Sequence, residues 1–466
     1  MKNIELYRKS SYVISVKLEH TDDKYMLIHG YTGAMDIVGK DLADQIKKMS
    51  KEEFVDSPFS VETTKMLYSR GYLTDKNIDE ELNYVQHLAH LFHQRDKKLF
   101  KSFAFLVAYN CNFRCPYCFE TNISQDGRHW SKRVFSKELV DKAYEAMLLI
   151  EPQKELHNKI ITLYGGEPLL KENREIIDYI LKRGKSLGYK FDAITNGYDL
   201  QAYMDVLTPG LIEALQITVD GCKERHDERR THYIMGKSFD KIIENIGMAL
   251  QRGIKVMVRV NTDANNFADL HYLGQLFEQL GYASLPNFKM YSALLRGDNN
   301  DVTSQKLKYI GAKKFHDLHK KEKFRYNCQD YGTLNKIEAT IRTQKIFELH
   351  SIYCGAQSGS AIFDPYGDFY SCYQTVGDKK HIIGHYGKGI LEYSDASKHW
   401  YEHNISVSHK CSHCKYGLLC GGGCLAKADY NIESGFGKSF CNDYPSVFTI
   451  AVNKAYDALV TNKQFL

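Results

Sequence analysis

Proline is scarce in this 466-residue chain, with 8 residues in all, which argues against long disordered linkers. No window of about 18 apolar residues lacks charge, so we expect no membrane span. The start, Met1 to Ser10, is polar and lacks the apolar stretch of a signal peptide, which makes a cytoplasmic protein the default expectation. The net charge of +5 is small for this length. It implies no nucleic-acid partner, although it would tolerate an acidic peptide.

The twelve cysteines are clustered along the chain. Three lie at Cys111, Cys115 and Cys118, and five lie between Cys411 and Cys441. The others are Cys222, Cys328, Cys354 and Cys372. The cytosol keeps thiols reduced, so clusters of this kind indicate metal ligands rather than disulfides.

The middle of the chain alternates strand and helix patterns. The expected strands are Ser102–Ala108, Ile160–Tyr164, Phe191–Thr195, Leu215–Val219, Ile254–Val260 and Phe288–Leu294. Helical patterns such as Leu139–Leu149, Arg174–Lys185 and Asp240–Gln251 separate them. This alternation predicts a parallel α/β sheet, and six strands form a partial barrel because a closed one needs eight.

The first 95 residues have the pattern of a separate small module. Strands are expected over Tyr12–Leu18, Tyr25–His29 and Met35–Val38, and helices over Lys40–Met49, Val61–Tyr68 and Ile78–Asp96. Three strands and three helices in this order suggest a winged-helix-like fold. The last third, in contrast, is rich in turns and cysteines and has little periodic pattern, as expected where metal clusters replace part of a core.

The strongest chemical signal is the loop Cys111-Asn-Phe-Arg-Cys115-Pro-Tyr-Cys118, directly after the first strand of the sheet. Three thiolates on one loop hold three irons of a four-iron cluster and leave the fourth iron open for a small-molecule ligand. The alternative is a zinc site, but zinc favours four ligands in CxxC pairs. Loops after strand C-termini form the active site of parallel barrels, and this loop has that position.

This loop resembles the hallmark of the radical S-adenosylmethionine (SAM) superfamily. Tyr164-Gly165-Gly166-Glu167-Pro168 resembles the motif with which that superfamily holds the SAM ammonium group. The resemblance assigns the following residues to the SAM pocket: Tyr117, Gly165, Gly166, Glu167, Thr195, Asn196, Gln216, Asp220, Arg230, Arg259 and Asn261. Tyr117 is expected against the adenine. Arg230 is a candidate for the SAM carboxylate, since a guanidinium pairs with carboxylates in a fork.

The C-terminal third resembles the seven-cysteine SPASM domain, which holds two auxiliary four-iron clusters. Its spacing is Cys354-x12-Gly367-x4-Cys372, then Cys411-x2-Cys414-x5-Cys420-x3-Cys424, then Cys441. The resemblance assigns Cys411, Cys414, Cys420 and Cys441 to an outer cluster and Cys354, Cys372 and Cys424 to an inner one. Cys328 is one candidate for the fourth inner ligand, and the alternative is an open iron that accepts a substrate thiolate. A zinc ribbon is the competing interpretation, but seven cysteines do not divide into sets of four.

These resemblances cover nearly the whole chain and imply three domains. Residues 1–95 resemble the peptide-recognition domain of peptide maturases, which binds a leader peptide as an added strand. Residues 96–320 are the expected radical SAM partial barrel, and residues 321–466 the SPASM domain. A generic capping subdomain is the alternative for the first segment. The implied partners are a precursor peptide with a leader and a flavodoxin- or ferredoxin-type electron donor.

The resemblance implies SAM, three four-iron clusters and a 5′-deoxyadenosyl radical that removes an unactivated hydrogen. The leading hypothesis for the product is a thioether between a peptide cysteine and a carbon of another residue. Carbon–carbon cross-linking and a sulfatase-type maturase are the alternatives. From a different class, a non-catalytic iron–sulfur electron carrier would share the cysteines but would not need the SAM-pocket residues. No acid–base catalytic residue stands out in the sequence.

Overall fold

A computed structural model describes residues 6–21, 23–99, 101–118, 120, 130–295, 307–322, 327–328, 333–430 and 435–461. The chain divides into two compact units. Unit 1 contains Met1–Lys97, Asp330–Cys354 and His403–Leu466, and unit 2 contains Lys98–Gln329 and Gly355–Glu402. Among the described helices, none is both long and apolar enough to cross a membrane.

A parallel sheet is the centre of unit 2. Its strands follow one another in chain order as β6 (Phe103–Leu106), β7 (Ile160–Tyr164), β8 (Lys190–Thr195), β9 (Ile212–Thr218), β10 (Lys255–Thr262) and β11 (Phe288–Leu294). The expected α/β class and its six parallel strands are therefore confirmed. A short strand, β12 (Asn327–Cys328), extends the parallel order beyond β11.

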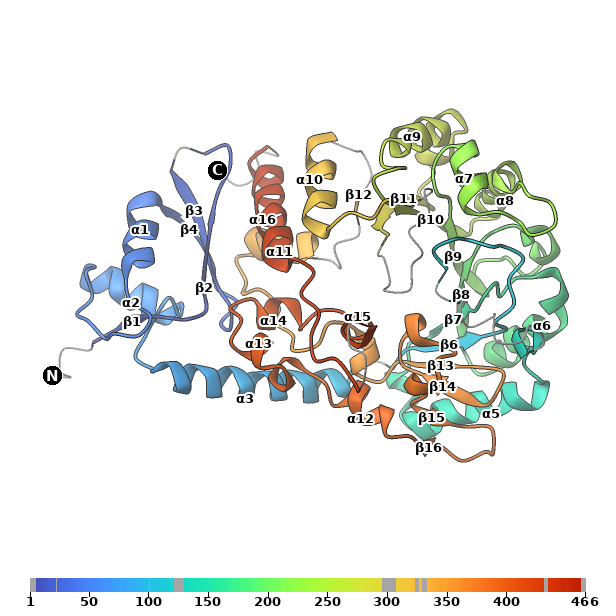
Figure 1. Cartoon of the computed structure of the whole chain (residues 1–466), viewed down its shortest axis with the longest axis horizontal. Helices are drawn as coiled ribbons and strands as arrows, with labels where there is room; N and C mark the ends of the chain where they lie inside the picture. Colours follow the sequence, from blue (N-terminus) through green and yellow to red (C-terminus); the bar gives the residue numbers. More distant parts are fainter. Residues whose placement is uncertain are drawn as a thin grey trace. The chain divides into compact units, whose positions relative to one another are not determined.

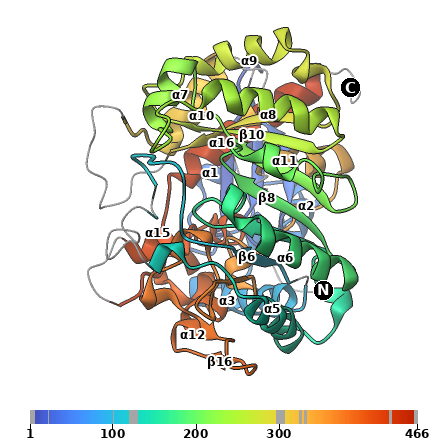
Figure 2. The same cartoon turned by 90° about the vertical axis from the view of Figure 1, so that its right-hand side faces the viewer.

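Helices lie along one side of this sheet, as Figures 1 and 2 show. They are α5 (Lys137–Ile150), α6 (Arg174–Ser186), α7 (Lys223–Arg229), α8 (Phe239–Gln251) and α9 (Asp269–Gln279). In α5, the Ser136 side chain caps the first turn by accepting the Leu139 N–H, and Val140, Ala143 and Met147 are buried at helical spacing. The helices thus bury their apolar stripes on one face of the sheet.

The other face of the sheet is less covered. Alternate residues of the central strands are only half-buried, including Asp192, Gln216, Arg259 and Tyr291, while their neighbours along each strand are buried. Because side chains alternate between the two faces of a strand, these half-buried residues share the face opposite the helices.

Residues 361–393 add four strands at the β6 edge of the same sheet. β13 (Ala361–Phe363) pairs with β6 in parallel, and β14 (Asp368–Tyr370), β15 (Gly384–His385) and β16 (Glu392–Tyr393) continue as an antiparallel meander. Through this strand pairing, residues 355–402 belong to the same compact unit as the parallel sheet. The sequence-based division at residues 95 and 320 follows motifs, and it stays a prediction about functional domains.

Unit 1 contains the N-terminal module. β2 (Val13–Lys17), β3 (Lys24–His29) and β4 (Met35–Gly39) form an antiparallel sheet, and α1 (Lys40–Lys48), α2 (Val61–Ser69) and α3 (Ile78–Lys97) follow it. A second ladder joins β1 (Arg8–Lys9) to β5 (Leu73–Thr74). The strands and helices expected over the first 95 residues are all present, with ends shifted by no more than one residue.

The N-terminal sheet shares an apolar core with the C-terminal part of unit 1. Tyr12, Ile14 and Ile28 are buried together with residues of the cysteine-rich segment and of α16 (Tyr444–Thr461). The main C-terminal members of this core, here called the shared core, are Phe347, Leu349, Leu418, Leu419, Phe448 and Val452. The module is therefore continuous with the cysteine-rich part and is not an isolated appendage.

Candidate SAM and iron–sulfur site

The cysteine loop follows β6 and keeps its three thiols near one another. Burial raises the pKa of the Cys111 thiol well above its ordinary value, and the nearby charges of Glu167, Cys115 and Cys118 raise it further. The Cys111 sulfur also accepts the Phe113 N–H at 3.3 Å. None of the described cysteines, which include all twelve, forms a disulfide. Thiols that repel one another as anions are suited to a metal cluster, whose positive charge deprotonates its ligands.

The Gly165–Gly166 turn packs directly against the segment that leads into this loop. A Cβ on Gly165 would lie 2.4 Å from the Ala108 carbonyl oxygen, and Gly165 has a φ of +142°. A Cβ on Gly166 would lie equally close, 2.4 Å, to the Tyr109 carbonyl oxygen. The two glycines therefore let the end of β7 lie against the start of the cysteine loop, where other residues would clash.

Glu167 joins the ends of two strands. Its buried carboxylate accepts hydrogen bonds from the Thr195 hydroxyl at 2.6 Å, the Asn196 N–H at 2.6 Å and the Leu169 N–H at 2.9 Å. Burial raises the pKa of Glu167 to about 7, although these hydrogen bonds oppose the shift. Asn196 in turn donates to the Asn112 side chain at 2.7 Å. These contacts fix the cysteine loop relative to β7 and β8, and direct SAM contact by Glu167, Thr195 and Asn196 stays a prediction.

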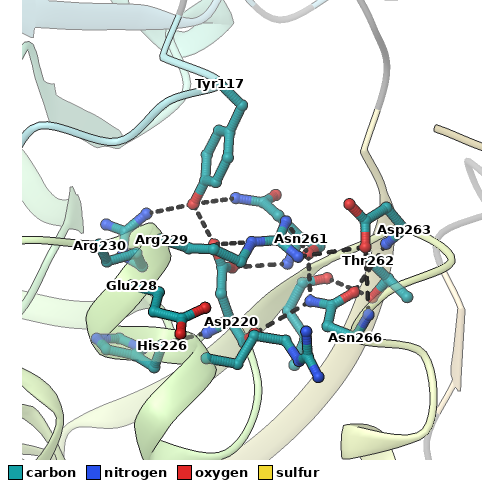
Figure 3. Close-up of polar contacts among 12 residues, drawn as sticks. Tyr117, Asp220, His226, Glu228, Arg229, Arg230, Asn261, Thr262, Asp263 and Asn266 are labelled. Carbon is teal, nitrogen blue, oxygen red and sulfur yellow. Dashed lines mark hydrogen bonds and ion pairs between the residues drawn. The ribbon is translucent and has the colours of Figure 1, made fainter. Parts of the chain in front are cut away.

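A dense polar network surrounds Tyr117, as Figure 3 shows. The Tyr117 hydroxyl donates to the Asp220 carboxylate and accepts from Arg230 at 2.8 Å and from the Asn261 amide at 3.3 Å. The Asn261 N–H donates to the other Asp220 oxygen at 3.1 Å. Four residues that the sequence placed in one pocket are thus brought together, and they hold the Tyr117 ring in one position.

Arg229 is also part of this network, although the sequence analysis assigned its neighbour Arg230, and not Arg229, to the SAM pocket. The Arg229 side chain is 1% exposed and lies between two buried carboxylates, 3.7 Å from Asp220 and 3.3 Å from Asp263. Its guanidinium lies 5.5 Å from the centre of the Tyr117 ring. In the sequence, the only sign of this role is the pair of consecutive arginines at the end of α7. The fold is needed to show that Arg229 is the one enclosed between the two carboxylates.

Two groups near the loop are buried without a hydrogen-bond partner among the described residues. The Nε of Arg230 has none, and neither carboxylate oxygen of Glu120 has one. Burial raises the pKa of Glu120 to about 8, and the charge of Glu167 adds to the shift. Sequence reasoning missed Glu120, which follows the last cysteine of the loop by two residues. Since buried polar groups normally find partners, these atoms mark where a polar ligand fits.

Two further predicted residues lie on the accessible face of the sheet. Arg259 donates from Nε to the Asn261 side-chain oxygen at 2.9 Å, and Gln216 accepts from the Tyr291 hydroxyl at 2.8 Å. Both residues are half-buried. Arg259 thereby contacts the Tyr117 network through Asn261, whereas Gln216 is linked to the neighbouring Tyr291.

The four cysteines of the predicted outer cluster lie together in unit 1. Burial raises the pKa of Cys420 to about 12, and Cys411, Cys441 and Cys414 all add to the shift, which places these thiols in one neighbourhood. Of the predicted inner set, Cys354 and Cys424 belong to unit 1 and Cys372 to unit 2. Cys328 is in β12 of unit 2, with its sulfur 3.4 Å from Nδ1 of His316. The assignment of both auxiliary sites stays a prediction.

A family model described as the radical SAM superfamily matches residues 105–266. This segment is a radical SAM domain. It contains the cysteine loop, the glycine turn and all of the Tyr117 network. The family uses SAM and a four-iron cluster. The three loop thiols fit the cluster, and the Arg230 Nε, which has no partner among the described residues, fits a polar group of SAM.

Known proteins resemble the chain beyond this domain. It is 22% identical over 373 residues to a cysteine-type anaerobic sulfatase-maturating enzyme of Clostridium novyi, covering 74% of this chain and 93% of the relative. The structure of anSMEcpe with AdoMet and the Cp18Cys peptide matches with a TM-score of 0.55 at 16% identity, over 78% of this chain and 99% of that one. Streptococcus suis SuiB bound to the precursor peptide SuiA matches with a TM-score of 0.51 at 14% identity, over 93% and 98%. These structures share the fold of the chain.

Proposed function

We propose that this chain is a maturase that uses radical SAM chemistry to modify a ribosomally made precursor peptide. The proposed product is a thioether from a cysteine sulfur to a carbon of another residue. The observation that carries the peptide substrate is the N-terminal sheet, which is present in the same chain as the radical SAM domain and ends in an open strand.

That open strand is β4. Within the described residues it pairs with β3 alone, and Ile37 near its middle is 45% exposed. A strand edge with unpaired backbone groups binds an extended peptide by adding it to the sheet. The match to SuiB bound to its precursor peptide SuiA covers 93% of this chain, whereas the match to anSMEcpe covers 78%. The larger shared portion favours a precursor peptide over a sulfatase as substrate.

Unit 2 supplies the residues for the reaction. Cys111, Cys115 and Cys118 would hold the cluster, and SAM bound there supplies a radical that removes an unactivated hydrogen. Tyr117 is fixed by Asp220 and Arg229 to one position for the adenine, and Nε of Arg230 is available for the SAM carboxylate. The protein orients SAM through these groups, and the uncovered face of the sheet admits the peptide.

The thioether hypothesis depends on the inner auxiliary cluster. If Cys354, Cys372 and Cys424 are its only protein ligands, one iron is open to a substrate thiolate, which metal coordination deprotonates. If Cys328 is the fourth ligand, the cluster is closed, and carbon–carbon cross-linking gains weight. Cys328→Ala therefore separates the two: retained iron supports the open cluster, and lost iron supports the closed one. Cys222→Ala is the matched control, since Cys222 lies outside both cysteine patterns.

A sulfatase-type maturase is the second candidate, favoured by the Clostridium novyi relative. The deciding experiment incubates the reduced, reconstituted protein and SAM with one of two peptides, a Cys-containing precursor encoded beside its gene or a sulfatase-derived Cys peptide. We expect 5′-deoxyadenosine and a precursor that has lost two hydrogens and no longer reacts with iodoacetamide. A product that keeps a reactive thiol indicates carbon–carbon bonding. Modification of the sulfatase peptide alone would replace the proposal with the second candidate.

A further inference from the structure

Three consecutive large apolar side chains are exposed beside the cysteine loop. They are Tyr233, Ile234 and Met235, with exposed fractions of 56%, 69% and 65%. They form the tip of a tight hairpin, residues 231–237, in which His232 pairs with Gly236. Gly236 has a φ of +72°, which favours glycine. No sequence motif falls on this segment, and exposed apolar clusters of this kind mark interaction sites.

The hairpin is bonded directly to the backbone of the cysteine loop. The Arg114 N–H donates to the Thr231 carbonyl at 2.9 Å, and the Tyr233 N–H donates to the Asn112 carbonyl at 2.9 Å. Between these two bonds, Phe113 and His232 form a bridge. The hairpin is therefore an extra strand on the loop that carries Cys111 and Cys115. Any protein that contacts the tip lies next to the cluster ligands.

Positive side chains surround the apolar tip. The Arg114 guanidinium lies 5.0 Å from the centre of the Tyr233 ring and also donates to the Cys111 carbonyl at 2.7 Å. Lys237 is exposed on the hairpin itself. Lys241 lies 3.8 Å from the centre of the Tyr198 ring and pairs with Asp199 at 4.0 Å, so its charge is balanced within the fold.

The nearby carboxylates are mostly engaged within the fold. Asp227 accepts the N–H groups of Ser238 and Phe239, and Asp240 pairs with Lys223. Glu228 is exposed and adds one negative charge to the segment. Arg114 and Lys237 carry two exposed positive charges against the one negative charge of Glu228, which leaves the surface at the tip weakly basic.

We propose that residues 231–237 together with Arg114 form the docking surface for a small acidic electron-transfer protein of the flavodoxin type. This inference rests on the proposed function only through its need for electrons. One electron leaves the reduced flavin of the partner, and one electron is gained by the cluster that Cys111, Cys115 and Cys118 hold. No atom is transferred.

The size and character of the patch suit such a partner. Transient redox complexes have small interfaces, below about 1,200 Å², and a few central aromatic or aliphatic residues dominate their binding. A basic rim speeds encounter with an acidic protein and makes the rate sensitive to salt. The precursor peptide has a different expected site, the edge of β4.

The test compares two reductants on the reconstituted holoenzyme without any peptide. Stopped-flow absorbance follows reduction of the cluster by photoreduced flavodoxin and, separately, by dithionite. We expect Ile234→Ser combined with Met235→Ser to slow reduction by flavodoxin about tenfold, equivalent to about 1.4 kcal/mol, with no change for dithionite. Lys237→Glu should slow it roughly threefold at low salt and should lose that effect at high salt. Leu149→Ser is the matched control, because Leu149 is 54% exposed at the end of α5.

Other outcomes would overturn the inference. Equal rates for the hairpin variant and the parent, or equal losses with both reductants, would show that flavodoxin docks elsewhere. A hairpin variant that is reduced normally but binds the precursor peptide more weakly would make the hairpin a peptide site. SAM affinity, measured by equilibrium dialysis, serves as the check that each variant is folded. Because no peptide is present, failure of the peptide proposal would leave this result unaffected.

Discussion

The two best-defined cysteine regions of the molecule are held in place by different forces. In unit 2, the loop from Cys111 to Cys118 is fixed by polar contacts among Asn112, Asn196 and the Tyr117 network. Some buried polar atoms there have no partner within the part of the chain that the structure describes. In unit 1, the segment from Cys411 to Cys420 is fixed by apolar packing, since its Leu418 and Leu419 belong to the shared core. The first arrangement suits a site that exchanges a polar ligand. The second suits a permanent structural site.

The contrast extends to the role of the N-terminal module. The Tyr12 hydroxyl donates to the Ser412 carbonyl at 2.8 Å, and a Cβ on Gly30 would lie 2.1 Å from the Lys415 carbonyl oxygen. The module therefore covers the backbone of the outer-cluster segment. Removing residues 1–95 would expose the shared core, so truncation is a poor way to test peptide recognition, and point substitutions at the edge of β4 are better.

The largest expected effect is the loss of the loop cluster in unit 2 while the outer cluster of unit 1 is retained. Replacing Cys111, Cys115 and Cys118 together by Ala should abolish SAM cleavage and remove about four of about twelve irons. The irons of the predicted outer cluster should stay, because its cysteines all belong to unit 1 and the loop belongs to unit 2. Iron analysis and chromatographic assay of 5′-deoxyadenosine are the measurements. Unchanged iron, or zinc in its place, would contradict the cluster assignment.

A second prediction tests the polar side of the comparison. Arg229→Met leaves Asp220 and Asp263 as buried carboxylates without their cation, which should cost about 3–5 kcal/mol. We expect loss of SAM affinity together with a lower unfolding midpoint. Arg225→Met is the control, because the Arg225–Asp269 pair is partly exposed and such pairs contribute about 0–1 kcal/mol. Equal effects of the two substitutions would show that the enclosed arginine has no special role.

A third prediction tests the apolar side. Ile14 is fully buried in the shared core, so Ile14→Ala should destabilise unit 1 by about 2–5 kcal/mol. The iron of the outer cluster should become easier to remove with a chelator, while SAM affinity stays unchanged. Ile37→Ala, at a half-exposed position of β4, is the matched control. A fall in SAM affinity with Ile14→Ala would mean that the stability of unit 1 and SAM binding in unit 2 are coupled.

The sequence was informative wherever the signal was local. Strand and helix periodicity predicted the six central strands, and cysteine spacing predicted which thiols share a loop. Arg229 and Glu120 were missed because burial decides their roles, and burial depends on residues far away in the chain, such as Asp263 and Glu167. The pairing of Ala361–Phe363 with Phe103–Phe105 was missed for the same reason. A three-residue strand has almost no period of its own, and its partner lies more than 250 residues earlier.

The smallest predicted effect is the response of the N-terminal module to acid. His29 is fully buried, with Nε2 2.9 Å from the Ser10 hydroxyl and Nδ1 3.0 Å from the Thr32 hydroxyl. Burial lowers the pKa of His29 to about 3, although the charge of Glu81 opposes the shift. In the unfolded chain His29 has an ordinary histidine pKa of about 6.5. Between the two pKa values its imidazole is therefore protonated in the unfolded chain and neutral in the folded module. Stability is unaffected above the unfolded pKa and falls as pH drops below it, down to the folded pKa.

Between pH 7 and pH 5 this difference should cost unit 1 about 2 kcal/mol. His29→Gln should flatten that part of the pH profile, because an amide does not titrate, even though its overall stability is lower. The measurement is the urea unfolding midpoint followed by near-ultraviolet circular dichroism of the module's tyrosines at several pH values. His90→Gln, an exposed position on α3, should leave the slope as it is. If His29→Gln left the slope of the unfolding midpoint against pH unchanged, the acid sensitivity of unit 1 would come from other titrating groups and not from His29.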